Sequence, residues 1–239
     1  MTERGQSHVV GIVLLLGITT VALGGLTAVV GDVIGGQTGA ADERRVASTL
    51  DSELRPVEGT GPNRALVRFT EGRLGTVDRE IRVLNDSGVR REIEAGGLVY
   101  TSGSNRVGFV AGSVVRGEPG NAGLVRGPPV TITRDNDTLV VGAVAVGERG
   151  AAVSGSGGVT ARLRTNVSHD RTRHPPDDYR VAIETATPGP LGRFLGERGL
   201  STTTTDIDGD GVPSVVVDPT GQQELYLVVH SMDMEVADG

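Results

Sequence analysis

The sequence predicts a mainly β protein, in which an N-terminal transmembrane helix and a short stalk precede an antiparallel β-sandwich-like domain with one short helix. The first observation is an uncharged apolar run from Val9 to Gly31. The second is the pattern beyond Asn63, where short alternating apolar and polar runs are separated by turn residues. The third is the composition, with only three Phe, three Tyr and no Trp. A core of β-branched and small aliphatic side chains favours sheets.

Residues 6–34 form the predicted transmembrane or filament-core helix. A helix over the uncharged run would be about 34 Å long, and a bilayer core is about 30 Å thick. The run is apolar on all sides, as expected for a helix in lipid or in the centre of a bundle. Its glycines, such as Gly11 and Gly17, would let neighbouring helices approach closely. Glycine is also frequent in transmembrane helices that do not associate, so both environments stay open.

Residues 35–57 form the predicted stalk. After two glycines a helical pattern resumes over about residues 40–55, with apolar residues three and four positions apart. That stripe consists of Val46, Ala47, Leu50, Leu54 and Val57. Pro56 ends the helix. We expect this helix to pack its aliphatic stripe on the domain that follows.

Residues 58–239 form the predicted head domain, with roughly ten short strands. We expect the strands at 65–69, 80–84, 89–93, 106–110, 130–133, 138–146, 159–165, 179–184, 214–217 and 224–229. The segment Asn85–Gly88 is a hairpin signal, and Pro190–Arg198 has the proline and following glycine of a short helix. Ala151–Gly158 is a candidate internal linker. It would divide two sheets of one domain or two domains, and we expect one domain.

The composition excludes several classes of activity. All 23 basic residues are arginine, so there is no lysine for a Walker A phosphate loop or a Schiff base. There is no cysteine for a disulfide, a thiol nucleophile or a metal site. The net charge of −7, without a clustered arginine patch, argues against nucleic acid as a partner. No Gly-x-Ser-x-Gly elbow is present, and the sequence does not predict an enzyme.

The segment His169–Asp178 is the one group of titratable residues with the look of a catalytic or metal site. It holds two histidines, His169 and His174, with nearby carboxylates. Pro175, Pro176 and the surrounding charges favour solvent. We therefore expect a polar loop between two strands rather than a site.

The segment from Asp206 to Ser214 resembles the first half of an EF-hand-type calcium loop, with aspartates at positions 1, 3 and 5 and glycine at position 6. Its ligands would come from Asp206, Asp208, Asp210, Val212 and Ser214. Position 12 is Val217 instead of the bidentate glutamate, so the match is incomplete. The alternative is a solvated acidic turn before a strand. Calcium is the one cofactor that the sequence suggests, and it would stiffen the domain rather than serve catalysis.

Three Asn-x-Ser/Thr sequons are candidate glycosylation sites: Asn85, Asn136 and Asn166. The first two fall on predicted turns, from which a glycan could project. The tripeptide is frequent by chance, but three copies beyond an apolar helix are consistent with an extracellular domain.

The N-terminus resembles the class III signal of archaeal type IV pilins and archaellins. A short charged leader ends in Arg4-Gly5 directly before Gln6-Ser7 and the apolar run, and the stretch to Gly17 is similar to the start of haloarchaeal pilin-like surface proteins. The resemblance implies that a prepilin peptidase cuts between Gly5 and Gln6 and leaves the helix on the mature protein. It departs from bacterial type IV pilins at the fifth mature position, which is Val10 instead of glutamate.

This resemblance implies a pilin-like subunit, of the minor kind because the chain is long, in an archaeal type IV pilus-like surface structure. Its partners would be the prepilin peptidase, the membrane, and other pilin-like subunits that bundle through the N-terminal helix. The C-terminal domain would lie outside the cell. Two alternatives at the N-terminus are an unprocessed single-span anchor and a cleaved secretory peptide. The alternative function is a membrane-anchored extracellular β domain that acts as a monomeric binding module and does not polymerise.

Overall fold

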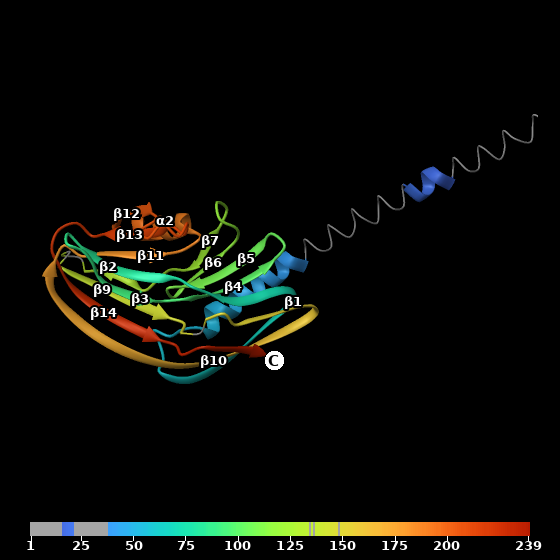
Figure 1. Cartoon of the computed structure of the whole chain (residues 1–239), viewed down its shortest axis with the longest axis horizontal. Helices are drawn as coiled ribbons and strands as arrows, with labels where there is room; N and C mark the ends of the chain where they lie inside the picture. Colours follow the sequence, from blue (N-terminus) through green and yellow to red (C-terminus); the bar gives the residue numbers. More distant parts are fainter. Residues whose placement is uncertain (1–15, 22–37, 134, 136, 148) are drawn as a thin grey trace, which may run out of the picture. The chain divides into compact units, whose positions relative to one another are not determined.

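A computed structural model describes residues 16–21, 38–133, 135, 137–147 and 149–239 (Figure 1). The chain divides into two compact units, Met1–Ala41 and Asp42–Gly239. The second unit begins inside the predicted stalk, so most of the stalk residues belong with the head. The predicted head is therefore one unit and not two.

Few residues of the predicted N-terminal helix can be described. Residues 16–21 are helical. The predicted cleavage residues Gly5 and Gln6, and the remainder of the 6–34 segment, lie outside the described residues. Within the part of the chain that the structure describes, no helix is both long enough and apolar enough to cross a membrane.

A helix spans residues 38–53, and its part in the second unit confirms the predicted apolar stripe. Four stripe residues are at most 3 % exposed: Val46, Ala47, Leu50 and Leu54. Val57, the last predicted member, lies beyond the helix and is 47 % exposed. The buried carboxylate of Asp42 accepts a hydrogen bond of 2.6 Å from the backbone N–H of Thr70. This bond ties the helix to a neighbouring strand.

Arg126 holds the other end of the helix. Its guanidinium donates hydrogen bonds of 2.7 Å to the backbone carbonyls of Asp51 and Leu54, and Nε donates to the Gly112 carbonyl at 3.1 Å. The last carbonyls of a helix have no partner within the helix. A cation at this end also suits the helix dipole. Arg126 therefore joins the last helical turn to the sheet.

The larger of the two sheets has ten strands in the order β7-β6-β5-β4-β1-β10-β14-β9-β8, with β15 also paired to β10. These strands are β1 Gly61–Val77, β4 Gly97–Ser102, β5 Asn105–Val110, β6 Ser113–Arg116, β7 Gly123–Arg126, β8 Val130–Ile132, β9 Thr138–Ala145, β10 Ala152–Asp177, β14 Gln223–Ser231 and β15 Glu235–Asp238. The pair β9–β14 is parallel, whereas the sequence predicts only antiparallel neighbours. The other pairs of this sheet are antiparallel.

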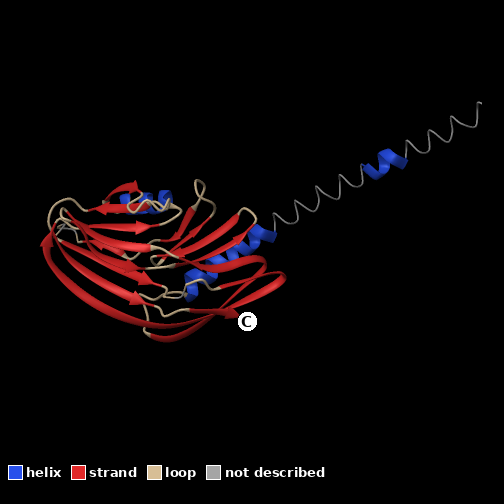
Figure 2. Cartoon of the chain, viewed as in Figure 1, coloured by secondary structure: helices blue, strands red, loops and turns tan. Residues whose placement is uncertain are grey.

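The smaller sheet has five strands in the order β12-β13-β11-β2-β3. They are β2 Glu80–Asn85, β3 Gly88–Glu94, β11 Arg180–Glu184, β12 Ser201–Thr205 and β13 Ser214–Asp218. The predicted hairpin joins β2 to β3. The predicted short helix is α2, Pro188–Gly196, which lies against β12 and β13 (Figure 2).

Two hydrophobic cores lie on opposite faces of the larger sheet. Adjacent residues Ala143 and Val144 on β9 belong to different cores, as expected where successive side chains alternate between faces. One core packs the stripe of the helix 38–53 against the larger sheet. The other lies between the two sheets. The described residues thus form a mainly β domain with two sheets and few helices, consistent with the predicted β-sandwich-like class.

Strand β10 corrects two predictions. The expected linker Ala151–Gly158 is not a linker, because β10 begins at Ala152 and pairs there with β1. The expected loop His169–Asp178 is also strand, because β10 continues to Asp177 and pairs there with β14. Glycines and prolines obscure the alternation at both ends of the strand. Pairing with two different neighbours still keeps it extended.

Candidate functional site

The smaller sheet carries a row of polar side chains on the face away from its core. Ile81 and Ile183 point into the core between the sheets, so their strand neighbours Glu80 and Glu184 point outward. Ser214 lies directly opposite Glu184 in the register of β11 and β13. Glu184 and Ser214 are nevertheless only 3 % and 1 % exposed. A covering segment must therefore lie over this face.

The acidic loop between β12 and β13 contributes to that cover. Asp208 Oδ2 accepts a hydrogen bond of 2.6 Å from Nη2 of Arg82, a β2 residue on the same outer face. Arg82 also pairs with Glu80 and, through Nε at 3.3 Å, with Glu92. Its side chain is only 4 % exposed. We refer to Glu80, Arg82, Glu92, Glu184 and Asp208 as the Arg82 cluster.

The electrostatics of the Arg82 cluster follow from this burial. Burial raises the pKa of the Glu184 carboxyl, and the positive charge of Arg79 opposes the rise. Burial also acts to lower the pKa of Arg82, but the hydrogen bond to Asp208 and the charge of Glu80 outweigh it, so that its pKa is raised. Arg82 therefore stays charged and is the central cation of the cluster.

The fold brings the aspartates of the predicted calcium loop together, but other groups of the protein already hydrogen-bond to their carboxylates. Asp206, Asp208 and Asp210 have carboxylate oxygens within 4.8 Å of one another, and Asp208 is also within that distance of Glu80 and Glu184. Asp208 bonds Arg82, and Asp206 accepts hydrogen bonds of 2.9 and 3.0 Å from the N–H groups of Gly209 and Gly211.

The remaining predicted calcium positions differ in their surroundings. Asp210 accepts a hydrogen bond of 2.8 Å from the N–H of Val212. Val217, at position 12, is buried in the core. The hydroxyl of Ser214 has no hydrogen-bond partner among the described residues. Because Arg82 supplies the positive charge that a calcium ion would supply, the cluster is an internal ion-pair network, and calcium binding stays a prediction.

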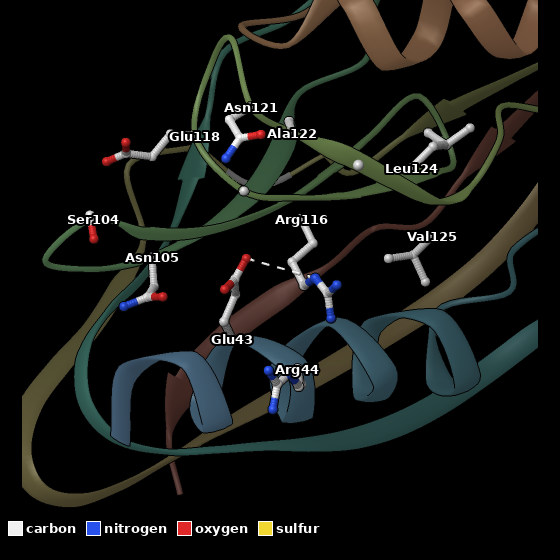
Figure 3. A pocket seen from close by; sticks show the side chains of 12 residues that line it. Glu43, Arg44, Ser104, Asn105, Arg116, Glu118, Asn121, Ala122, Leu124 and Val125 are labelled. Atoms are coloured by element: carbon white, nitrogen blue, oxygen red, sulfur yellow. Dashed lines mark ion pairs between the residues drawn. The ribbon is translucent and has the colours of Figure 1, made fainter. Parts of the chain in front are cut away.

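A polar cleft of about 600 Å³ lies between the first turns of the helix in the second unit and the strands β5 to β7. Glu43 and Arg116 point toward each other across it, with their charged atoms 3.9 Å apart (Figure 3). Burial raises the pKa of the Glu43 carboxyl, although Arg116 and Arg44 lower it. Asn105 and Asn121 add amide groups to the lining. The cleft offers charges and hydrogen-bonding groups to a polar ligand. No local sequence pattern predicts it, because its residues come from separate segments.

The three sequons lie in different surroundings. The Asn85 side chain is buried, and its Nδ2 donates a hydrogen bond of 2.7 Å to Asp177. A glycan on Asn85 would therefore require this turn to open. Asn166 is exposed on β10. Asn136 lies outside the described residues, and glycosylation stays a prediction at each position.

The two histidines of the 169–178 segment do not come together. His174 lies beside Tyr179, with ring centres 6.1 Å apart. His169 instead faces His230 on β14, with their Nδ1 atoms 2.8 Å apart. Sequence reasoning missed His230, since only the pairing of β10 with β14 brings it to His169.

Comparison with known proteins gives one family. The chain matches the model of a family of unknown function, DUF7289, over residues 4–235. The chain belongs to DUF7289. No curated protein and no solved structure matches it. The DUF7289 match takes in Gly5, the apolar run and the β domain together.

Proposed function

We propose that this DUF7289 chain is a pilin-like subunit, of the minor class, in an archaeal type IV pilus-like surface structure. The N-terminal apolar helix would anchor it in the membrane before assembly and bundle with other pilin-like subunits afterwards. The β domain would lie outside the cell as the head. Enzymatic activity is not part of the proposal.

The observation that carries the proposal is the helix 38–53, whose apolar stripe is built into a core of the β domain. A short segment of chain joins this helix to the uncharged run Val9–Gly31. A binding domain on a flexible tether would have no need to bury the residues next to its anchor. A subunit that transmits force from a filament core to its head does need to bury these residues, because a helix buried in the head resists being pulled out.

The N-terminal motif supplies the second support. A leader of five residues, ending in Arg4-Gly5, precedes Gln6. Prepilin peptidase would remove residues 1–5 and expose Gln6. The DUF7289 match begins at residue 4, so it includes this motif with the head.

The experiment is to identify the mature N-terminus and the assembly state of the protein taken from its native membrane. We expect Gln6 as the first residue, by N-terminal sequencing or intact mass, and the protein in sheared high-molecular-weight surface fractions. Gly5→Leu should leave the leader in place and remove the protein from those fractions. Ser7→Ala, two residues beyond the cut, is the matched control and should be processed normally.

The polar cleft of about 600 Å³ favours one other function. A monomeric, membrane-anchored binding module would use such a cleft for a polar ligand. In that case the mature chain would begin at Met1 or Thr2, and the sheared fractions would lack it. Cleavage beyond Asp32 would contradict both functions, because the apolar helix would then be lost.

A further inference from the structure

Two imidazoles face each other on the larger sheet at hydrogen-bonding distance. His169 on β10 and His230 on β14 are directly opposite in the antiparallel register. Their Nδ1 atoms are 2.8 Å apart, and their rings are nearly perpendicular, with an interplanar angle of 81°. His230 is 5 % exposed, whereas His169 is half-buried. The pair can therefore be reached from solvent on the His169 side.

One hydrogen is shared between the two rings. At 2.8 Å only one of the two Nδ1 atoms can carry a hydrogen, and the other accepts it through its lone pair. The accepting ring is neutral and carries its own hydrogen on Nε2.

An imidazole nitrogen with a lone pair is also the atom that binds a metal ion. A ligating histidine usually donates its second ring N–H to a carbonyl or carboxylate, which fixes the tautomer and the ring orientation. Burial, followed by the charges of His169 and Arg171, lowers the pKa of His230. Glycine at position 142 leaves room for the ring, since a Cβ there would lie 3.1 Å from Nε2 of His230.

We propose that His169 and His230 bind one divalent transition-metal ion, of the Zn²⁺, Ni²⁺ or Cu²⁺ class, through their two Nδ1 atoms in place of the shared hydrogen. With metal–nitrogen bonds of about 2.0–2.1 Å and tetrahedral angles, the two nitrogens would be about 3.3 Å apart. Half-buried His169 can make this small adjustment by rotating its ring. Among the described residues, no third histidine, aspartate or glutamate forms a metal-binding group with both rings. The other coordination positions belong to water or an outside ligand.

The full-length protein in detergent gives a direct test, because the chain has only four histidines. The variant His8→Ala/His174→Ala keeps the proposed pair alone. In a calorimetric titration with Zn²⁺ we expect this variant to bind one equivalent and to melt at a higher temperature with Zn²⁺ present. Adding His169→Gln should lower the Zn²⁺ affinity by about tenfold or more and abolish the rise in melting temperature.

His169 is half-buried, so its replacement should leave the fold intact, and far-ultraviolet circular dichroism checks this. If the two-histidine variant fails to bind one equivalent of Zn²⁺, the proposal is wrong. It is also wrong if His169→Gln lowers the affinity by less than tenfold. Replacing the more buried His230 with Gln gives a second measurement on the same pair, and it must weaken Zn²⁺ binding in the same direction.

Discussion

Replacing Arg82 with methionine tests whether the Arg82 cluster is held together by its central cation. Methionine keeps most of the side-chain volume and removes the charge. Removing one partner of a buried ion pair costs about 3–5 kcal/mol, because the other charge is left buried without compensation. Here Glu80, Glu92 and Asp208 are 29, 52 and 38 % exposed, so water can solvate them once Arg82 is gone. Only Glu184, at 4 % exposure, cannot be rehydrated easily.

We therefore expect the lower end of that range, a loss of about 3 kcal/mol in the free energy of unfolding. The assay is urea denaturation of the full-length protein, followed by circular dichroism and analysed by linear extrapolation. The matched control is Arg91→Met on β3, whose side chain is 37 % exposed and lies 3.8 Å from Asp170. An exposed pair of this kind should change stability by less than about 1 kcal/mol.

Calcium gives the same experiment a second outcome. Without Arg82, the carboxylates of Glu80, Glu184 and Asp208 would converge with only Arg79, beside Glu184, as a counter-ion, and calcium should restore part of the lost stability. Wild-type protein should gain less from calcium, since Arg82 already neutralises the cluster. A loss no larger than that of Arg91→Met would refute the reasoning. So would a calcium response equal in wild type and Arg82→Met.

Three further predictions address other parts of the second unit. Leu50→Ala should lower the free energy of unfolding by about 2–5 kcal/mol, because Leu50 is fully buried between helix and sheet. The control Ser52→Ala, at an exposed position of the same helix, should change it by less than about 0.5 kcal/mol in the same denaturation assay. Equal effects of the two substitutions would mean that the helix is not part of the core. Gly127→Ala should lower the free energy of unfolding by about 1–3 kcal/mol, because a Cβ there would lie 2.0 Å from the ring of Phe194. Combining Gly127→Ala with Phe194→Leu should recover part of the melting temperature. If the losses of the two single variants simply add, the clash with Phe194 is not the cause. The pKa of Glu43 is raised in the folded protein above its ordinary value of 4.5. The stability that Glu43 contributes at low pH is therefore lost as the pH rises through the folded pKa. Glu43→Gln should flatten the stability–pH curve above about pH 4.5, and a curve that keeps its wild-type slope would contradict this.

Local patterns in the sequence were sufficient to predict several elements. The spacing of Val46, Leu50 and Leu54 predicts a buried helix face, and that face is buried. The alternation around Ile81 and Ile183 predicts strands, and both residues lie in the core between the sheets. In each case one period of helix or strand is contained within a few residues. Long-range contacts are not needed to recognise it.

Features that depend on pairing between distant strands could not be predicted. The local sequence does not predict the length of β10, because glycines near Ala152 and prolines near Asp177 resemble turn signals. Its partners β1 and β14 are also far away in the sequence. The burial of Arg82 has the same cause, since a charged residue in a strand is expected to be exposed. Only the fold brings Asp208 over it. The His169–His230 pair also requires the register of two strands.

Strand β10 links the two cores, because Ala161 and Leu163 lie in the core beside the helix, and its second part pairs with β14, whose Leu225 and Leu227 lie in the core between the sheets. Neither half of the domain can lose its packing without disturbing a strand that the other half needs. Heating should therefore give one cooperative transition, with matching calorimetric and van't Hoff enthalpies, rather than two separate ones. Under the proposed function, a domain without a separately unfolding half would resist shear outside the cell as one unit.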